Sequence, residues 1–168
     1  MSILETIRSR RSVREFTGQK VSDTQIEEIL EAGRWAPSGL NNQPWRFVVV
    51  GDQDLKEGVA ACTTYTRTIK AANVLITVFL DPDVMYDRTK DIQAIGACVQ
   101  NMLLTIHDLE LGACWMGEIL NRRNEVEKLL EVPESFELMV VLAIGHPQPG
   151  NRSGSRKTLD ELIQARFD

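Results

Sequence analysis

The sequence has few histidines and cysteines, and neither type is arranged for metal or nucleophilic chemistry. Its histidines are His107 and His146, and no cysteine or carboxylate stands at metal-ligand spacing from either. Its cysteines, Cys62, Cys98 and Cys114, are odd in number and form no C-x-x-C pair. We therefore expect free thiols in a reducing cytoplasm, no metal site, and no Ser/His/Asp or Cys/His catalytic set.

Glycine-rich signatures are missing as well. No G-x-G-x-x-G follows a predicted strand, and the chain has neither a P-loop nor a G-x-S-x-G turn. These absences argue against a Rossmann dinucleotide site, a P-loop nucleotide site and an α/β-hydrolase. If the protein is an enzyme, we expect a bound cofactor to carry the chemistry.

The chain also lacks a basic surplus and long apolar runs. Its 19 Lys and Arg stand against 24 Asp and Glu, a net charge of −5, so little is left to neutralise nucleic-acid phosphates. No apolar run is long enough to span a bilayer, and residues 1–5 lack the apolar core of a signal peptide. With 168 residues, 43% of them hydrophobic, we expect one globular domain over 1–168 that binds neither nucleic acid nor membrane.

The chain is organised around the segment Trp35–Phe47, which joins a predicted helix to a predicted strand. Its two prolines, one glycine and two asparagines favour a shaped loop over a helix or a β-ladder. Small polar groups and exposed amides at Ser38, Gly39 and Asn41 suit a flat heteroaromatic ring with polar edges. The alternative is a rigid connector whose tryptophans belong to the core.

Two basic clusters stand near opposite ends of the chain. The segment Arg8–Arg14 holds four arginines among serines, and the tail holds Arg152, Arg156 and Lys157. Guanidinium groups beside hydroxyls suit a phosphate or another anion. The alternatives are cations that complement a helix dipole in the first cluster and a solvated loop in the second.

Capping boxes and hydrophobic periodicity predict the secondary structure. Three S/T-x-x-E/Q boxes predict helix starts: Ser2 with Glu5, Ser22 with Gln25, and Thr158 with Glu161. Further helices are predicted at about 54–62, 88–111 and 121–130, and strands at 46–51, 72–80, 113–116 and 136–144. Gly112 is expected to cap the longest helix and Asn121 to begin the next.

The longest predicted helix has no charged residue between Ile92 and Ile106. Apolar residues at spacings of three and four predict a seam for another helix, formed by Ile92, Ile95, Val99, Met102, Ile106 and Leu109. A helix that is apolar on nearly every side is buried all round. A second subunit is one source of that cover, and burial within a single domain is the alternative.

Five segments, taken together, resemble the nitroreductase family of FMN-dependent oxidoreductases. They are Arg10–Phe16 (RRSVREF), Ala36–Trp45 (APSGLNNQPW), Leu111–Gly117 (LGACWMG), Ala143–Pro147 (AIGHP) and Arg156–Lys157 (RK). They follow the family's order over essentially the whole chain. The second segment is specific, whereas each of the others alone is a weak signal.

The resemblance implies an α+β fold of three layers, with a central mixed β-sheet flanked by helices. It also implies an intertwined homodimer with two FMN molecules at the subunit interface. NAD(P)H would deliver hydride to flavin N5, and acceptors such as nitroaromatics or quinones would then take the electrons. Two alternatives stay open: a specialised enzyme of the same fold, dehalogenase-like or flavin-fragmenting, and a non-catalytic flavin-binding protein.

The resemblance further implies cofactor-binding residues by position. The FMN phosphate, the ribityl chain and the N1–C2 edge would be contacted by Arg10, Arg11, Ser12 and Arg14. The ring would be met, from the partner subunit, by Pro37, Ser38, Gly39 and Asn41. Its N5–O4 edge would face the backbone of Met116 and Gly117, and the phosphate would be closed off by Arg156 and Lys157. No side chain is expected to act as a nucleophile.

Two departures from the family bear on this site. Larger members place an Asn and a Lys before the strand that begins here near Ala72. This chain has Tyr65–Lys70 at that place, with Arg67 as a candidate substitute. The long excursion before the central helix is reduced to Asp81–Lys90, so we predict an open site that tolerates acceptors of different size.

Overall fold

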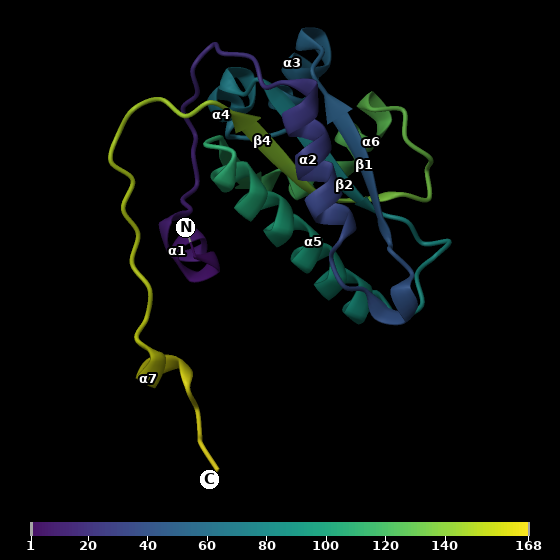
Figure 1. Cartoon of the computed structure of the whole chain (residues 1–168). Coiled ribbons are helices and arrows are strands. Elements are labelled where there is room, and N and C mark those ends of the chain that lie inside the picture. Colours follow the sequence, from purple (N-terminus) through teal and green to yellow (C-terminus); the bar gives the residue numbers. More distant parts are fainter. Residues whose placement is uncertain (1, 168) are drawn as a thin grey trace.

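The computed structural model describes residues 2–167 and places helices on both faces of one β-sheet (Figure 1). The strands are β1 Trp45–Val50, β2 Val74–Leu80, β3 Gly112–Met116 and β4 Glu137–Gly145. The α-helices are α1 Ile3–Ser9, α2 Asp23–Arg34, α3 Gln53–Ala61, α4 Thr66–Ala71, α5 Arg88–Asp108, α6 Arg123–Leu129 and α7 Leu159–Leu162. Two 3₁₀ turns are η1 Gly39–Asn41 and η2 Glu118–Arg122.

The sheet has the strand order β1-β2-β4-β3, and each neighbouring pair is antiparallel. This arrangement confirms the predicted α+β class. The four-stranded sheet is antiparallel rather than mixed as expected. In the described chain, parallel pairing is confined to an isolated bridge between Ser12 and Ala113. That bridge matters for the site, since it lays the arginine-rich N-terminal segment along β3.

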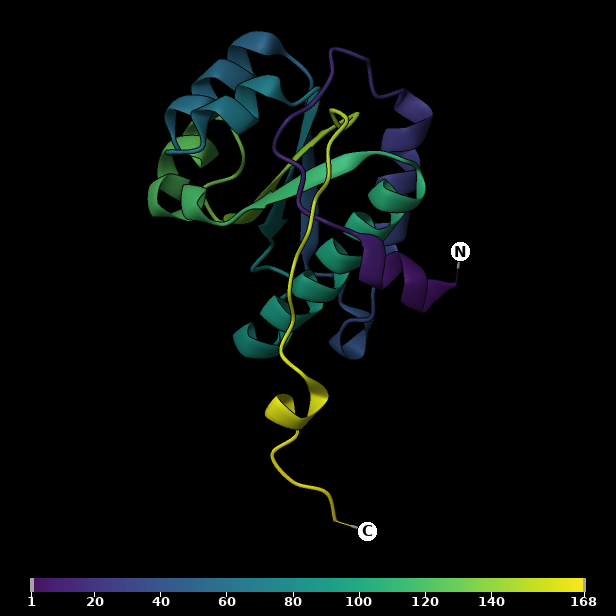
Figure 2. The same ribbon diagram turned by 90° about the vertical axis from the view of Figure 1, so that its left-hand side faces the viewer.

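Alternating side chains on the central strands build two cores. On β2, Ile76 and Val78 pack in the core of α2 and α5, whereas Leu75 and Phe79 pack in the core of α3, α4 and α6. This is the two-residue period of a strand that is buried on both faces. Figure 2 shows the two groups of helices on either side of the sheet. The predicted three-layer arrangement follows directly from this alternation.

The three predicted capping boxes are present, at the starts of α1, α2 and α7. The prediction for Gly112 is wrong. The left-handed residue that ends α5 is Glu110, with φ 59°, and it is held by bonds from Leu111 N to Ile106 O and from Glu110 N to His107 O, a Schellman motif. Gly112 instead opens β3, where a Cβ would lie 2.6 Å from Val13 Cγ2.

Two further predictions are corrected. Asn121 does not begin a helix, because it lies inside η2, and α6 starts after Arg122 without a side-chain cap. The long helix α5 is not buried all round within one chain. The seam residues Ile95 and Met102 are buried, but Ile92, which was predicted to belong to the seam, is exposed, as is Gln100. The uncharged run therefore presents an uncovered surface.

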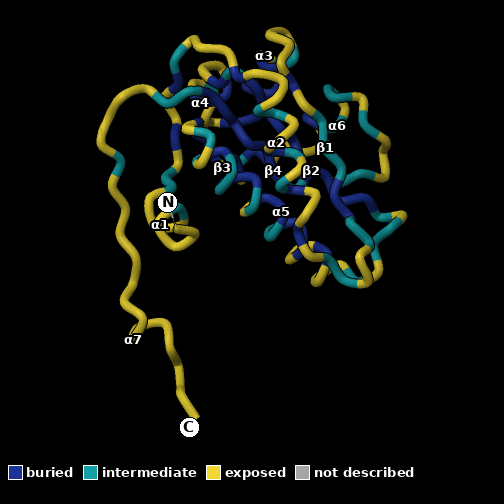
Figure 3. The backbone as a smooth tube through the Cα atoms, viewed as in Figure 1, coloured by how far each residue is buried: buried dark blue, intermediate teal, exposed yellow. Residues whose placement is uncertain are grey.

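Both chain ends extend away from the sheet. Helix α1 has no buried residue, and residues 153–167 are exposed along their whole length, which Figure 3 shows as an exposed arm that carries α7. In the described part of the chain, no helix combines the length and apolar character needed to cross a membrane. The cysteines Cys62, Cys98 and Cys114 are free, as predicted, and the structure shows that all three are buried. Burial raises the pKa of the Cys98 thiol to about 12.

Candidate cofactor site

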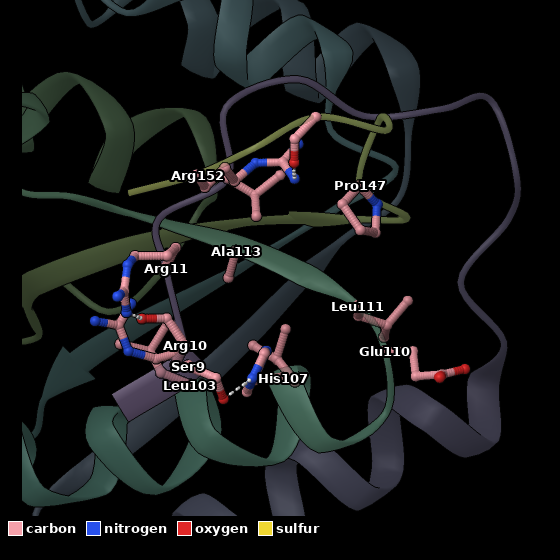
Figure 4. Close-up of a pocket in the computed structure, with 13 residues that line it drawn as sticks. Ser9, Arg10, Arg11, Leu103, His107, Glu110, Leu111, Ala113, Pro147 and Arg152 are labelled. Carbon is pink, nitrogen blue, oxygen red and sulfur yellow. Dashed lines mark hydrogen bonds between the residues drawn. The ribbon is translucent and has the colours of Figure 1, made fainter. Parts of the chain in front are cut away.

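A cavity of about 440 Å³ lies where the end of α1, the C-terminal half of α5 and the start of β3 meet. Arg10 and Arg11 from the N-terminal segment, His107 from α5 and Arg152 from the tail line it, as Figure 4 shows. Apolar side chains complete the wall: Val13, Leu103, Ile106, Leu111 and Ala113. The cavity thus combines cationic side chains with an apolar wall.

Backbone pairing fixes the segment that carries these arginines. Val13 N donates to Ala113 O at 2.8 Å, and Thr17 N donates to His146 O at 2.8 Å. At the other end of the segment, the Ser9 hydroxyl lies 2.7 Å from His107 Nε2. The strand edge and the end of α5 therefore hold the segment at both ends, and its arginines are presented from an ordered backbone.

The arginines at this cavity are not paired with a carboxylate in the described part of the chain. Among the described residues, Arg10, Arg11 and Arg156 form no ion pair with a carboxylate, although Glu110 lines the cavity. Burial and the nearby charges of Arg156 and Arg11 lower the pKa of Arg10. The Arg11 Nε is buried without a hydrogen-bond partner in the described chain. Such a cluster fits an anionic ligand.

The same N-terminal segment reaches a second hollow. Arg14 lines a small pocket of about 130 Å³ with Tyr65, Met116 and Gly117 at the C-terminal end of β3. The neighbouring Glu118 carboxylate accepts hydrogen bonds from Thr63 Oγ1 at 2.5 Å and from Thr64 N at 3.1 Å. The turn after β3 is thereby tied to the loop that precedes α4.

Arg67, the candidate substitute for the family's Asn and Lys, lies near this second hollow. It lines a pocket of about 310 Å³ with Arg14 and Glu15, and its guanidinium is 3.6 Å from the Glu15 carboxylate. The side chain is 91% exposed. It therefore points into solvent beside Arg14, and its contact with a cofactor stays a prediction.

The predicted ring-binding loop lies at the opposite end of α5. Pro37, Ser38 and Gly39 line a hollow of about 290 Å³ with residues of the N-terminal half of α5, Lys90, Gln93, Ala94 and Ala97. The loop is strained, because Leu40, Asn41 and Gln43 have φ of 54°, 54° and 48°. Left-handed non-glycine residues cost on the order of 1–3 kcal/mol each. Of the flanking tryptophans, Trp45 is buried and Trp35 is 72% exposed.

One chain therefore does not bring all predicted residues together. Arg10, Arg11 and Arg156 converge, Ser12 pairs with Ala113 beside them, and Arg14 meets Met116 and Gly117 farther along β3. The loop with Pro37, Ser38, Gly39 and Asn41 is elsewhere, because Lys90 and His107 are separated by about 25 Å along α5 at roughly 1.5 Å per residue. Lys157 is exposed on the arm. The sequence did not predict that His107 lines the cavity with the arginines, because its place there depends on a tertiary contact with Ser9.

Comparisons with known proteins identify the family of this chain. A model of the nitroreductase family matches residues 7–67 and 62–146. The chain belongs to the nitroreductase family. This family member is 32% identical over 148 residues to an Archaeoglobus fulgidus protein assigned as an NADH dehydrogenase/NAD(P)H nitroreductase, with 86% of this chain and 85% of the relative covered.

Two further relatives support the assignment of this nitroreductase-family chain. The crystal structure of a protein from Desulfovibrio desulfuricans assigned as a nitroreductase, in complex with FMN, is 46% identical, with a TM-score of 0.94 over 99% of this chain and 97% of that chain. An NADPH-flavin oxidoreductase from Vibrio harveyi is 29% identical over 157 residues, with 86% of this chain and 65% of that protein covered. The predicted family, its fold and the oxidoreductase class are confirmed.

Proposed function

We propose that this chain is an FMN-dependent oxidoreductase that accepts hydride from NAD(P)H and reduces small electrophiles such as nitroaromatics or quinones. The observation that carries the proposal is that Arg10 and Arg11 line one cavity and that Arg156 lies close beside both of them. These arginines come from opposite ends of the sequence and have no carboxylate paired with them in the described chain. The FMN complex of the Desulfovibrio desulfuricans relative supports FMN as the ligand.

The residues present fit FMN. Arg10, Arg11 and Arg156 would hold the phosphate through charge-assisted hydrogen bonds, and the unpartnered Arg11 Nε offers one such donor. FMN, when bound, supplies reversible hydride transfer. Arg14 would place positive charge beside the ring, where reduction adds negative charge, and the backbone near Met116 would offer an amide donor. No nucleophilic side chain is required.

A second copy of the chain is needed to complete this site. The ring-binding loop and the arginine segment lie at opposite ends of α5, so an antiparallel copy packed along α5 would bring one chain's loop to the other chain's arginines. The uncovered face of α5 suits such a contact because its residues from Ile92 to Gln100 are uncharged: Ile92, Gln93, Gly96, Ala97 and Gln100. We therefore propose a homodimer with two shared FMN sites.

The extended chain ends support an intertwined dimer. Leu159, Leu162 and Phe167 on the C-terminal arm are 72%, 63% and 96% exposed, and Ile3 on α1 is 80% exposed. Large apolar side chains left in water on two projecting segments mark surfaces that a partner covers. We propose that the arm crosses onto the second subunit and that residues 1–168 act as one FMN-binding domain.

Reconstitution and turnover test the proposed reaction. The purified protein should be yellow, release FMN on denaturation, and oxidise NADH or NADPH when a nitroaromatic or quinone is added. A protein that retains no flavin after incubation with FMN would refute the cofactor assignment. Bound flavin that NAD(P)H never reduces would indicate a non-catalytic flavin protein, and loss of intact FMN during aerobic reduction would indicate a flavin-fragmenting enzyme.

Complementation between two defective variants tests the shared site. Arg10→Ala damages the arginine segment, and Gly39→Ala forces the loop to shift because its Cβ would lie 2.0 Å from Tyr86 Oη. Each homodimer should bind FMN poorly. Mixed dimers should regain one intact site, built from the Arg10 of one chain and the loop of the other. If both groups served the same chain's flavin, mixing would restore nothing.

A charge on the uncovered face of α5 tests the dimer itself. Ala97→Glu should place an unpaired charge in the interface and give a monomer that binds FMN weakly, as measured by sedimentation and flavin fluorescence. Gln53→Glu, on the exposed start of α3, is the matched control and should stay dimeric. A wild-type monomer that is folded and loaded with flavin would refute the proposal.

A further inference from the structure

The short segment between β2 and α5 is bonded to the strained Ser38–Gln43 loop rather than free of it. Figure 1 shows the two lying together at the N-terminal end of α5. Asp81 begins the segment, and its amide donates to Pro44 O at 2.9 Å, just after the loop. Its carboxylate pairs with Arg46 at 2.6 Å, and Arg46 in turn donates to Gln43 O at 3.1 Å.

A buried carboxylate holds the other end of this segment. Asp91 is fully buried in the first turns of α5. Its Oδ2 accepts hydrogen bonds from the amides of Tyr86 at 3.0 Å and Asp87 at 3.1 Å. Its Oδ1 accepts from Asn42 Nδ2 at 2.8 Å. A buried charge of this kind persists only where hydrogen bonds compensate its lost hydration, and here they come from the segment and from the loop.

The Asn42 side chain and the Tyr86 ring carry this connection into the loop. Asn42 Nδ2 also donates to Val84 O at 3.1 Å, so its amide bridges the segment and the carboxylate. The Tyr86 ring packs directly on Gly39, whose added Cβ would lie 2.0 Å from Tyr86 Oη. Lys90 Nζ lies 5.1 Å from the centre of the same ring. Gly39 and Lys90 therefore confine the Tyr86 ring from two sides.

The strain in the loop shows why these bonds matter. Leu40, Asn41 and Gln43 hold left-handed backbone conformations that residues other than glycine adopt only where their surroundings impose them. Within the loop, Gln43 N donates to Ser38 Oγ at 3.0 Å and Gln43 Nε2 donates to Asn41 O at 3.1 Å. Two backbone bonds, from Asn41 N to Ser38 O at 3.2 Å and from Asn42 N to Gly39 O at 3.1 Å, close the turn. From outside the loop, its middle is held by the Asn42 side chain and the Tyr86 ring, and both residues bond to Asp91.

We propose that Asp91 is a positioning residue for the flavin: through Asn42 and Tyr86 it holds the Ser38–Gln43 loop in the form that meets the ring. The inference rests on the proposed function, since it takes this loop as the ring contact. It also makes the segment from Asp81 to Lys90 a fixed support rather than a mobile lid. Acceptor tolerance then comes from a short rigid rim.

Matched variants at the start of α5 test this role. Asp91→Asn keeps the shape but replaces an acceptor with a donor facing the Tyr86 and Asp87 amides or Asn42. We expect FMN affinity to fall roughly tenfold, equivalent to about 1.4 kcal/mol, and the visible circular dichroism of bound FMN to change. Asp87→Ala is the control, because it removes the cap bond to Lys90 N and leaves Asn42 untouched. It should lower the thermal midpoint without changing flavin affinity or spectrum.

A thermodynamic cycle shows whether Asp91 acts through Asn42. Asn42→Ala alone should weaken FMN binding, and combining it with Asp91→Asn should cost less than the sum of the two single changes. Asn42→Ala alone also carries the test if Asp91→Asn fails to fold. Unchanged FMN affinity in these variants, or an equal loss in Asp87→Ala, would overturn the proposal. If wild type itself binds no FMN, the proposed function fails first.

Discussion

Replacing Arg10 or Arg156 with alanine separates a ligand site from a structural cluster, because the two roles predict opposite effects on stability. Arg10 is partly buried beside Arg11, and its pKa is lowered by burial and by the charges of Arg156 and Arg11. Its positive charge is therefore unfavourable in the protein without ligand. Removing it should leave the thermal midpoint of the apoprotein unchanged or slightly raised.

The magnitude of the effect on binding follows from the expected contacts. A hydrogen bond to a charged group contributes about 1.5–3 kcal/mol net, so each substitution should weaken FMN binding roughly 10- to 150-fold at about 1.4 kcal/mol per tenfold change. Riboflavin lacks the phosphate and should lose far less affinity in either variant. Added FMN should raise the thermal midpoint of wild type more than that of the variants, because the ligand binds only the folded state.

Fluorescence titration of the three apoproteins with FMN and riboflavin measures these differences. Arg34→Ala is the matched control, since Arg34 forms an exposed ion pair with Glu31 on α2 and does not line the cavity that holds Arg10 and Arg11. Its flavin affinities should equal those of wild type. Equal FMN dissociation constants in wild type, Arg10→Ala and Arg156→Ala would refute the reasoning. The first basic cluster would then only complement a helix dipole, and the second would be a solvated loop.

Three further predictions concern stability. Lys56→Met should lower the free energy of unfolding in urea by about 1–3 kcal/mol, because the buried Lys56 ammonium donates to two backbone carbonyls after α4. Gly112→Ala should destabilise the chain and weaken FMN binding, since its Cβ would lie 2.6 Å from Val13 Cγ2. Adding Val13→Ala should recover part of both losses. The hydrogen bond from Arg88 lowers the pKa of Glu137 in the folded protein. The ionised Glu137 therefore stabilises the fold above its pKa in the unfolded chain, about 4.3, and this stabilisation is lost as the pH falls. The difference in thermal midpoint between wild type and Glu137→Gln should therefore shrink from about pH 5 to pH 3.

Local signals in the sequence predicted the elements whose causes are local. The boxes Ser22–Gln25 and Thr158–Glu161 need only residues three apart, and both form. The unbroken apolar run of β2 reflects burial on both faces. Helix α4 gave no such signal, because it has six residues and no side-chain cap. The prediction that Gly112 caps α5 was wrong because the reason for this glycine is not local. Its small size leaves room for the Val13 side chain, which is distant in the sequence.

The candidate site could be predicted by residue type and not by arrangement. Arginine forks among serines suggest a phosphate wherever they occur, but the approach of Arg156 to Arg10 depends on how the tail leaves β4. His107 joins them only because α1 ends against the last turns of α5. No spacing in the sequence encodes these contacts. The motifs therefore suggested the class of ligand, but they did not predict which residues lie together around the candidate site.

In the proposed homodimer, the second subunit brings the predicted ring-binding loop to the flavin. A two-fold axis across α5 would map the N-terminal end of one helix onto the C-terminal end of the other, so a single self-complementary contact would create two equal sites. The uncharged run from Ile92 to Ile106 then has a specific physical cause. A charge there would cost desolvation at the contact that assembles both flavin sites. On this view the sequence keeps the middle of α5 free of charge because the helix joins the subunits and sets the distance between the two ends of the site.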